Sequence, residues 1–210
     1  MKETVSKFIK FLNLPFSRKI QVLSFFYRLV FCSVIYRLLC KKFGRRSIVK
    51  KPLIITYEDI SFGDDVIIWE DARIESVRSY FESSFQPHIK ISNGVSFQQR
   101  CHITAAGELI IGENSIISYD VMITDIDHEY VDVLTPIGKQ PLKVSPTIIG
   151  EQCFIGCGVK IQAGTQLGKH CIVGANSVVR GIFPDYSVIV GSPAKIVKTY
   201  DKKSNTWIRC

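Results

Sequence analysis

Apolar residues recur at every sixth position over much of the chain. In the C-terminal half, an aliphatic residue opens each group of six, at Ile149, Ile155, Ile161, Leu167 and Val173. The second place of a group is Gly, or once Gln, and the fifth place is a small or β-branched residue. Apolar first places and small or β-branched fifth places recur in earlier groups, which open at Phe62, Ile91, Phe97, Ile111 and Ile117. The pattern is therefore an internal repeat, and it governs the prediction of the fold.

A period of six is neither the 3.6 of a helix nor the 2 of a simple strand. It predicts a triangular coil of three short strands per turn, with the first and fifth residues pointing inward and neighbouring coils about 4.8 Å apart. We expect the glycine in second place to serve the tight corner beside it. Cys153 and Cys171 are one turn apart, so we expect them to stack inside the coil as small core residues, without a redox or metal role.

Residues 1–51 lie outside this repeat and are predicted to be helical. The stretch from Ile20 to Cys40 is rich in Phe, Leu and Val, but Arg28 and Arg37 interrupt it, so we do not expect a membrane span. The polar positions change sides along the stretch, which indicates two short helices or one helix with contacts on both sides. Such an appendage can cap the open edge of the first coil or attach to an anionic membrane, and both interpretations stay open.

The positive charge is concentrated in the same appendage. The chain of 210 residues has a formal charge of +8, and residues 1–51 hold 13 Lys and Arg against one acid, Glu3. The rest holds 14 Lys and Arg against 18 Asp and Glu, so we expect no nucleic-acid partner. Seven cysteines without a CxxC pair or a preceding signal peptide favour a reduced, cytoplasmic protein, with peripheral contact to the cytoplasmic face of the membrane as an option.

Three regions follow from these patterns. We predict an appendage over 1–51, a repeat domain over 52–200 and a polar tail over 201–210. The repeat is interrupted over 128–147, and a long excursion from a repeat fold is usually a functional loop.

The hexapeptide pattern resembles that of the left-handed β-helix acyltransferases, over roughly Ile60 to Lys198. The segment VMITDIDHEYVD is similar to one in the maltose, galactoside and nodulation-factor O-acetyltransferases, and closer still to one in polysaccharide O-acetyltransferases. The resemblance implies an all-β, left-handed parallel β-helix with a short N-terminal helical segment. It also implies a homotrimer, acetyl-CoA as co-substrate and no metal.

Thioester transfer to an alcohol needs a base, a donor for the developing oxyanion and a slot that aligns the thioester. Histidine is the usual base, because its pKa lies near the working pH. The resemblance gives this role to His128, and we expect Asp125 to orient its imidazole.

The stretch from Phe154 to Lys198 resembles the family's acetyl-CoA groove. By that resemblance, the backbone N–H of Cys157 meets the acetyl or pantetheine arm, while Phe154 and Ala175 line the groove. Arg180, Lys195 and Lys198 fall where basic residues contact the CoA phosphates. Gln98 occupies the place of an acceptor-binding Asn.

The expected reaction is acetyl transfer from acetyl-CoA to a sugar hydroxyl, in the synthesis of surface polysaccharide, capsule or lipopolysaccharide. The acceptor would be a sugar or a lipid-linked saccharide. Two alternatives remain from the sequence: a xenobiotic or other small-molecule acetyltransferase of the same fold, and a non-catalytic β-helix scaffold.

Overall fold

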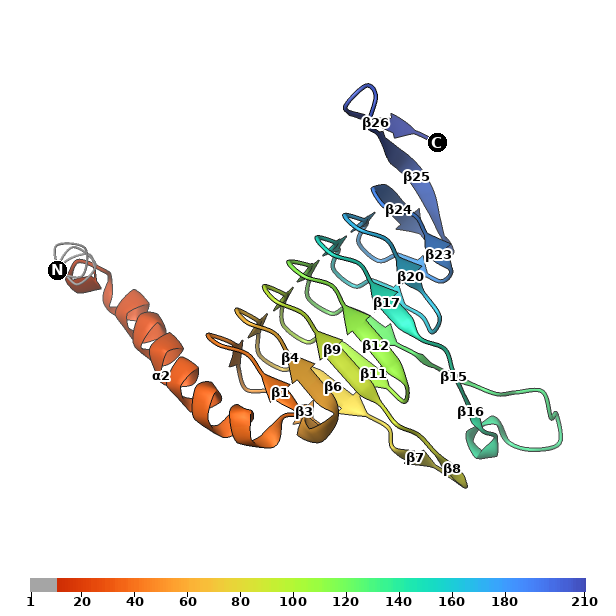
Figure 1. Cartoon of the computed structure of the whole chain (residues 1–210), viewed down its shortest axis with the longest axis horizontal. Coiled ribbons are helices and arrows are strands. Elements are labelled where there is room, and N and C mark those ends of the chain that lie inside the picture. Colours follow the sequence, from red (N-terminus) through yellow and green to blue (C-terminus); the bar gives the residue numbers. More distant parts are fainter. Residues whose placement is uncertain (1–10) are drawn as a thin grey trace.

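The centre of the molecule is a three-sided prism of stacked coils (Figure 1). The computed structural model describes residues 11–210. Each turn contributes one strand to each face, and successive strands within a face run parallel, as the repeat predicts.

Within each face, the strands follow one another along the prism axis. The first face consists of β1 (Lys42–Phe43), β4 (Ile60–Phe62), β9 (His88–Ile91), β12 (Glu108–Ile111), β17 (Thr147–Ile149), β20 (Gln166–Leu167) and β23 (Ile182–Phe183). The second face consists of β2 (Ile48–Val49), β5 (Ile67–Ile68), β10 (Ser96–Phe97), β13 (Ile116–Ile117), β18 (Phe154–Ile155), β21 (Ile172–Val173), β24 (Ser187–Gly191), β25 (Ala194–Asp201) and β26 (Thr206–Arg209). The third face consists of β3 (Ile54–Ile55), β6 (Arg73–Ser76), β11 (His102–Ala105), β14 (Met122–Thr124), β19 (Lys160–Ile161) and β22 (Val178–Val179).

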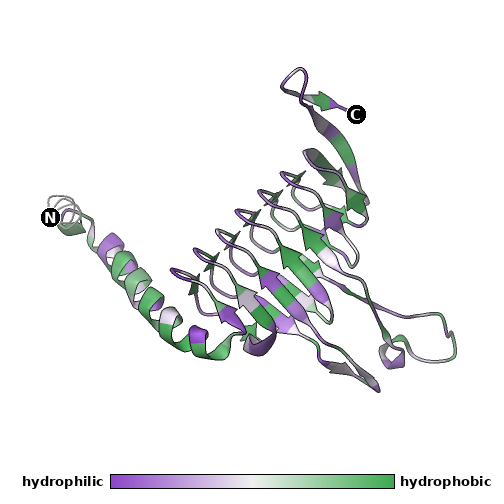
Figure 2. Cartoon of the chain, viewed as in Figure 1, coloured by the Kyte–Doolittle hydropathy of each residue, from purple (hydrophilic) through white to green (hydrophobic). Residues whose placement is uncertain are grey.

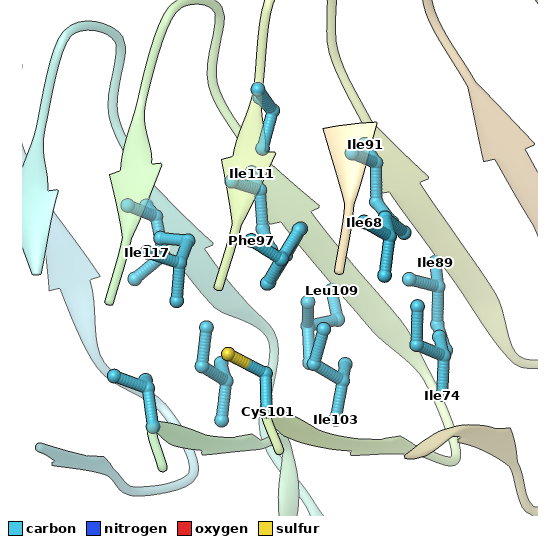
Figure 3. Close-up of a cluster of buried hydrophobic side chains, with 14 of the residues drawn as sticks. Ile68, Ile74, Ile89, Ile91, Phe97, Cys101, Ile103, Leu109, Ile111 and Ile117 are labelled. Carbon is cyan, nitrogen blue, oxygen red and sulfur yellow. The ribbon is translucent and has the colours of Figure 1, made fainter. Parts of the chain in front are cut away.

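The core is a column of side chains along the prism axis, shown in part in Figure 3. The first residues of the repeats are buried, as predicted, and the fifth residues join them. Cys153 and Cys171 are buried and precede paired positions of β18 and β21, so the predicted stacking of the two thiols is confirmed. Buried hydroxyls at the fifth place bond to the corners: Ser115 donates to the Gly150 carbonyl and accepts from the Cys153 amide. These apolar and hydroxyl layers hold the three faces together.

The glycines in second place have a different role from the one predicted. A Cβ at Gly150 would lie 2.4 Å from the carbonyl oxygen of Gly168, and one at Gly112 would lie 2.5 Å from the carbonyl carbon of Gly150. Neither glycine has a positive φ; in these groups Asn114 and Gln152, two positions further on, take the left-handed conformation. The second-place glycines therefore permit close approach between successive coils, and the fourth residue makes the corner.

The first coil begins earlier than the sequence analysis placed it. β1 pairs with β4 and β2 pairs with β5, so residues 42–49 belong to the prism and the boundary at residue 51 needs correction. The run from Phe43 to Ile48 has the hexapeptide form, with Gly44 second and Ser47 fifth. At the other end, β25 and β26 continue the second face as antiparallel strands, so residues 201–210 form part of a hairpin with 194–201.

A long helix, α2 (Phe16–Leu39), leads into the prism. The polar pattern allowed two short helices or one longer helix, and the structure has one continuous helix over this stretch. Residues 1–10 of the predicted appendage lie outside the described residues. Cys32 and Tyr36 are buried against the first coil, where Tyr36 packs against Phe43 and Tyr57, the latter in the short helix η1 (Tyr57–Asp59). The C-terminal turns of α2 thus cover the open end of the core. By length and composition α2 also meets the criterion for a membrane span, although Arg28 and Arg37 argued against one.

Two excursions leave the prism on the same side (Figure 1). The predicted one opens with β15 (Ile126–His128), contains the short helix η2 (Ile137–Lys139) and returns through β16 (Leu142–Val144). The second is a small hairpin of β7 (Ser79–Tyr80) and β8 (Ser83–Ser84), which the sequence analysis missed. The sequence does contain a sign of this hairpin, because the six-residue repeat is interrupted there. Groups open at Phe62, Ile68 and Ile74, and the next one opens only at Ile91.

A glycine substitution tests the stacking. We expect Gly150→Ala to lower the free energy of unfolding by about 1–3 kcal/mol, because the new Cβ would collide with backbone of the next coil. Gly138→Ala is the matched control, since a Cβ at Gly138 meets nothing within 4 Å. Denaturant unfolding of both variants measures the difference, and equal stabilities would contradict the close-approach role.

Candidate active site

His128 stands at the root of the larger excursion, on the stalk formed by β15 and β16. The two strands pair antiparallel, with His128 opposite Leu142 and Asp127 opposite Lys143. The Ser145 amide donates to the Asp125 carbonyl and the Glu129 amide donates to the Pro141 carbonyl, which closes the stalk at both ends. His128 itself is exposed. A solvent-accessible imidazole is thus presented by a hydrogen-bonded pair of strands.

The smaller hairpin supports this position. The Tyr80 ring meets the His128 ring edge to face, with centroids 5.7 Å apart, and the Tyr80 hydroxyl donates to the Gly138 carbonyl at 2.7 Å. The base of the hairpin is fixed by Asp59, which accepts hydrogen bonds from Arg78 and Ser76. The Arg78 guanidinium holds the pKa of Asp59 below its ordinary value, so the pair is ionised at neutral pH. Tyr80 therefore joins the two excursions beside His128.

Asp125 does not orient His128, contrary to the prediction. Its side chain is fully buried, and its two oxygens accept from the amides of Ala106 at 2.8 Å and Gly107 at 2.7 Å. Burial raises the pKa of Asp125, and these two hydrogen bonds oppose the rise. Within residues 11–210 no hydrogen bond joins it to the imidazole. Asp125 instead fixes the chain where it leaves the prism.

Asp127, the other acidic neighbour of His128, forms an ion pair with Arg180. Arg180 follows β22 at the corner between the third and first faces, two coils beyond the start of the stalk. This pair gives Arg180 a contact in the base of the excursion, and about half of its side chain stays exposed. The expected contact of Arg180 with CoA phosphates stays a prediction.

The remaining residues predicted for acyl-CoA gather on the second face and the corner that ends it. Phe154 pairs with Ile172, Ile172 with Val188, and Val188 with Lys198, so Phe154 and Lys198 lie in one row across the sheet. Lys195 lies on the same strand as Lys198. Cys157 and Ala175 occupy equivalent places on successive coils at the corner, and Gln98 lies at this corner two coils earlier.

This corner presents backbone donors. Among the described residues, neither the Cys157 amide nor the Ala175 amide donates to a backbone carbonyl, while the amides of Gly156, Gly158 and Asn176 all do. The neighbouring Cys157 thiol raises the pKa of Tyr119, which lies on the coil before it. Two free N–H groups beside a small side chain suit a carbonyl or amide-rich ligand.

The His128 corner and the Cys157 corner are separate edges of one prism. The third-face strand β19, with Val159 before it and Gln162 after it, lies between the two edges. Residues of one chain therefore form two half-sites that face different directions. Within residues 11–210 no group of three or more His, Cys, Asp or Glu side chains is arranged to hold a metal.

Comparisons with known proteins agree with this architecture. Residues 146–181 match the bacterial transferase hexapeptide (six repeats). The chain is 35% identical over 126 residues to the Escherichia coli K12 protein WbbJ, named as a lipopolysaccharide biosynthesis O-acetyl transferase, covering 57% of this chain and 64% of WbbJ. It is 41% identical over 91 residues to a Mycobacterium tuberculosis protein named as an acetyltransferase, covering 43% of this chain and 30% of that protein. The chain thus spans less than two thirds of either relative.

The fold also matches solved structures. The N-acyltransferase AntD from Bacillus cereus, in complex with dTDP and 3-hydroxybutyryl-CoA, superimposes with a TM-score of 0.66 at 15% identity, covering 82% of this chain and 89% of AntD. A maltose O-acetyltransferase from Clostridium difficile superimposes with a TM-score of 0.50 at 22% identity, covering 81% of this chain and 75% of that protein. Its repeat and fold resemble those of the hexapeptide-repeat acyltransferase family. The prism is accordingly the left-handed parallel β-helix of this family.

Removal of the Tyr80 hydroxyl tests its supporting role. We expect Tyr80→Phe to weaken the docking of the excursion by about 1 kcal/mol, which corresponds to roughly fivefold faster hydrogen exchange of amides in residues 129–141. Tyr130→Phe is the control, because no hydrogen bond is formed by its hydroxyl among the described residues and its side chain is exposed. Unchanged exchange in Tyr80→Phe would mean that the hairpin does not hold the excursion.

Proposed function

We propose that this protein transfers an acetyl group from acetyl-CoA to a hydroxyl of a sugar. The observation that carries the proposal is the pair of half-sites: an exposed His128 on a hydrogen-bonded pair of strands at one edge and free amides flanked by lysines at another. Acyl transfer to an alcohol needs both a base and an oxyanion donor, and the chain supplies one of each.

His128 acts as the general base. Its imidazole accepts the proton of the acceptor hydroxyl while the hydroxyl oxygen attacks the thioester carbonyl, and the C–O bond forms. When the C–S bond breaks, the imidazolium returns that proton to the departing sulfur. Tyr80 limits the motion of the ring from one side. The Asp127–Arg180 pair steadies the backbone of the stalk below it.

Acetyl-CoA binds along the second face. The amides of Cys157 and Ala175 are placed to bond the pantetheine arm or the carbonyl oxygen, whose negative charge develops during attack. Phe154, with 46% of its surface exposed, offers an apolar plane to the arm. Lys195 and Lys198 lie further along the same face, where their charges match phosphates.

The complete site forms between two copies of the chain in a homotrimer. The two half-sites are separated by a full face, so His128 of one subunit completes the thioester site of the next. The tip of the excursion supports this assembly, since the side chains of Val131, Val133 and Leu134 are more than 80% exposed. An apolar tip of this size is suited to packing against another subunit.

A sugar acceptor is favoured by the relatives. WbbJ carries the name of a lipopolysaccharide biosynthesis O-acetyl transferase, and the structural neighbour from Clostridium difficile is a maltose O-acetyltransferase. We propose that the acceptor belongs to surface polysaccharide synthesis at the cytoplasmic side of the membrane. Gln98, half-buried at the Cys157 corner, is positioned to contact it.

The direct test is acetyl transfer to a panel of free sugars, nucleotide sugars and lipid-linked oligosaccharides, with products identified by mass spectrometry. We expect a mass gain of one acetyl group, and a rate that falls about 100- to 10,000-fold in His128→Asn. His170→Asn is the control, since His170 packs on Tyr186 and Trp207 near the C-terminal hairpin. Undiminished transfer by His128→Asn would exclude His128 as the base. Acetylation of small non-sugar molecules alone would favour a detoxifying enzyme, and absence of acetyl-CoA binding would favour a scaffold.

Mixed assemblies test the shared site. Ala175→Trp should block the thioester slot while leaving His128 intact, and size-exclusion chromatography checks that each variant assembles normally. Co-refolding equal amounts of His128→Asn and Ala175→Trp should restore about a quarter of the wild-type sites, because a working site needs the intact base next to an intact slot. A mixture as inactive as its components would place both half-sites of each working site in one subunit.

A further inference from the structure

One side of α2 presents an apolar surface that residues 11–210 do not cover. Side chains spaced by three or four residues form a stripe along the helix, and each is between 51% and 80% exposed: Phe16, Ile20, Leu23, Tyr27, Val30, Val34 and Leu38. This spacing places them on one side of a helix, which we name the apolar stripe. Figure 2 shows the apolar character along α2, interrupted by polar positions.

The apolar stripe faces away from the contact with the prism. Cys32 and Tyr36, which are buried, occupy the opposite side of the helix. Further toward the N-terminus, a groove of about 1100 Å³ lies between α2 and the first coil. Its lining includes the polar residues Gln21, Ser24 and Arg28 and also two members of the stripe, Ile20 and Tyr27. The polar positions of the helix therefore face the groove, and the other five members of the stripe do not line it.

The charges beside the stripe indicate which kind of partner binds it. Residues 11–51 hold ten Lys and Arg and no acid. Lys19 and Arg37 flank the stripe, and no described acidic residue forms an ion pair with either. A second copy of α2 packed on the stripe would bring like charges together without compensation. An anionic lipid surface would instead neutralise them.

The length of α2 that is not packed on the core determines whether the helix can cross a bilayer or lies in its surface. The first residue of α2 packed on the core is Leu29, so residues 16–28 stand free over about 20 Å. The hydrocarbon core of a bilayer is about 30 Å thick, so this segment is too short to cross it. An in-plane position also leaves Arg28 and Arg37 at the level of the headgroups.

We propose that α2 is a docking helix that lies in the surface of an anionic membrane, with the apolar stripe in the acyl region and Lys19 and Arg37 at the phosphates. Its C-terminal turns, packed on the first coil, fix the prism at the membrane through that end. This inference depends on α2 alone and holds whether or not the proposed transfer reaction is correct.

Co-sedimentation of the full chain with vesicles tests the proposal. We expect binding to vesicles of phosphatidylcholine with about one third phosphatidylglycerol, weaker binding to pure phosphatidylcholine, and loss of the difference at high salt. Leu23→Glu with Val30→Glu places two acids in the stripe and should reduce partitioning at least tenfold. Gln21→Glu with Ser24→Glu adds the same charge to the groove side of the same helix and should retain most of the binding.

Light scattering on the same variants separates a lipid partner from a protein partner. We expect both double variants to keep the particle mass of the wild-type chain. A smaller particle for Leu23→Glu with Val30→Glu alone would show that the stripe joins copies of the chain and would overturn the proposal. Absence of vesicle binding by the wild-type chain, or equal binding by the two double variants, would overturn it as well.

Discussion

Backbone hydrogen bonds between successive coils set the geometry on which the other features of the molecule depend. The Phe154 amide donates to the Cys171 carbonyl and the Gly156 amide to the Val173 carbonyl, each at 2.9 Å, and equivalent bonds recur along the prism. These bonds hold neighbouring coils at the separation of adjacent strands, so a Cβ at Gly112 or Gly150 would strike the backbone of the next turn. Glycine at these two positions is a consequence of the stacking. Within residues 11–210, the same spacing leaves the outer corner amides of Cys157 and Ala175 without carbonyl partners.

A rigid column of this kind separates structural and chemical roles by position. Inward residues such as Ile155 and Ser115 form the core and its internal hydrogen bonds, and they leave little freedom for chemistry. Chemistry is then confined to the corners and to the segments inserted between coils. The stalk that carries His128 and the hairpin that carries Tyr80 are two such insertions, and they meet outside the prism through the Tyr80–Gly138 hydrogen bond. A fold with flat, repetitive faces acquires an active site by this means.

The ends of the column pose a different problem, because the first and last coils have unpaired edges. At the C-terminal end, β25 and β26 extend the second face. At the N-terminal end, Tyr36 and Cys32 of α2 cover the apolar interior of the first coil. Only the last turns of α2 are needed for this cover, which leaves the remainder of the helix available for another contact. Capping and membrane docking are thus compatible functions of one helix.

The amino-acid pattern alone specified the repeat, the three-sided prism, the inward positions and the stacking of Cys153 on Cys171, because a strict period of six fixes which residues share a face. It also singled out His128, through the break in the repeat that follows it and through family resemblance. Tertiary contacts set the features that depend on distant segments. Asp125 is adjacent to the stalk in sequence, but its carboxylate is held by Ala106 and Gly107 from the preceding coil, and Arg180 reaches Asp127 from two coils away. Tyr80 approaches His128 from an insertion nearly 50 residues earlier, and no local pattern encodes such an encounter. Periodicity specifies the faces of a repeat, whereas the partners of its insertions are set only when the coils are stacked.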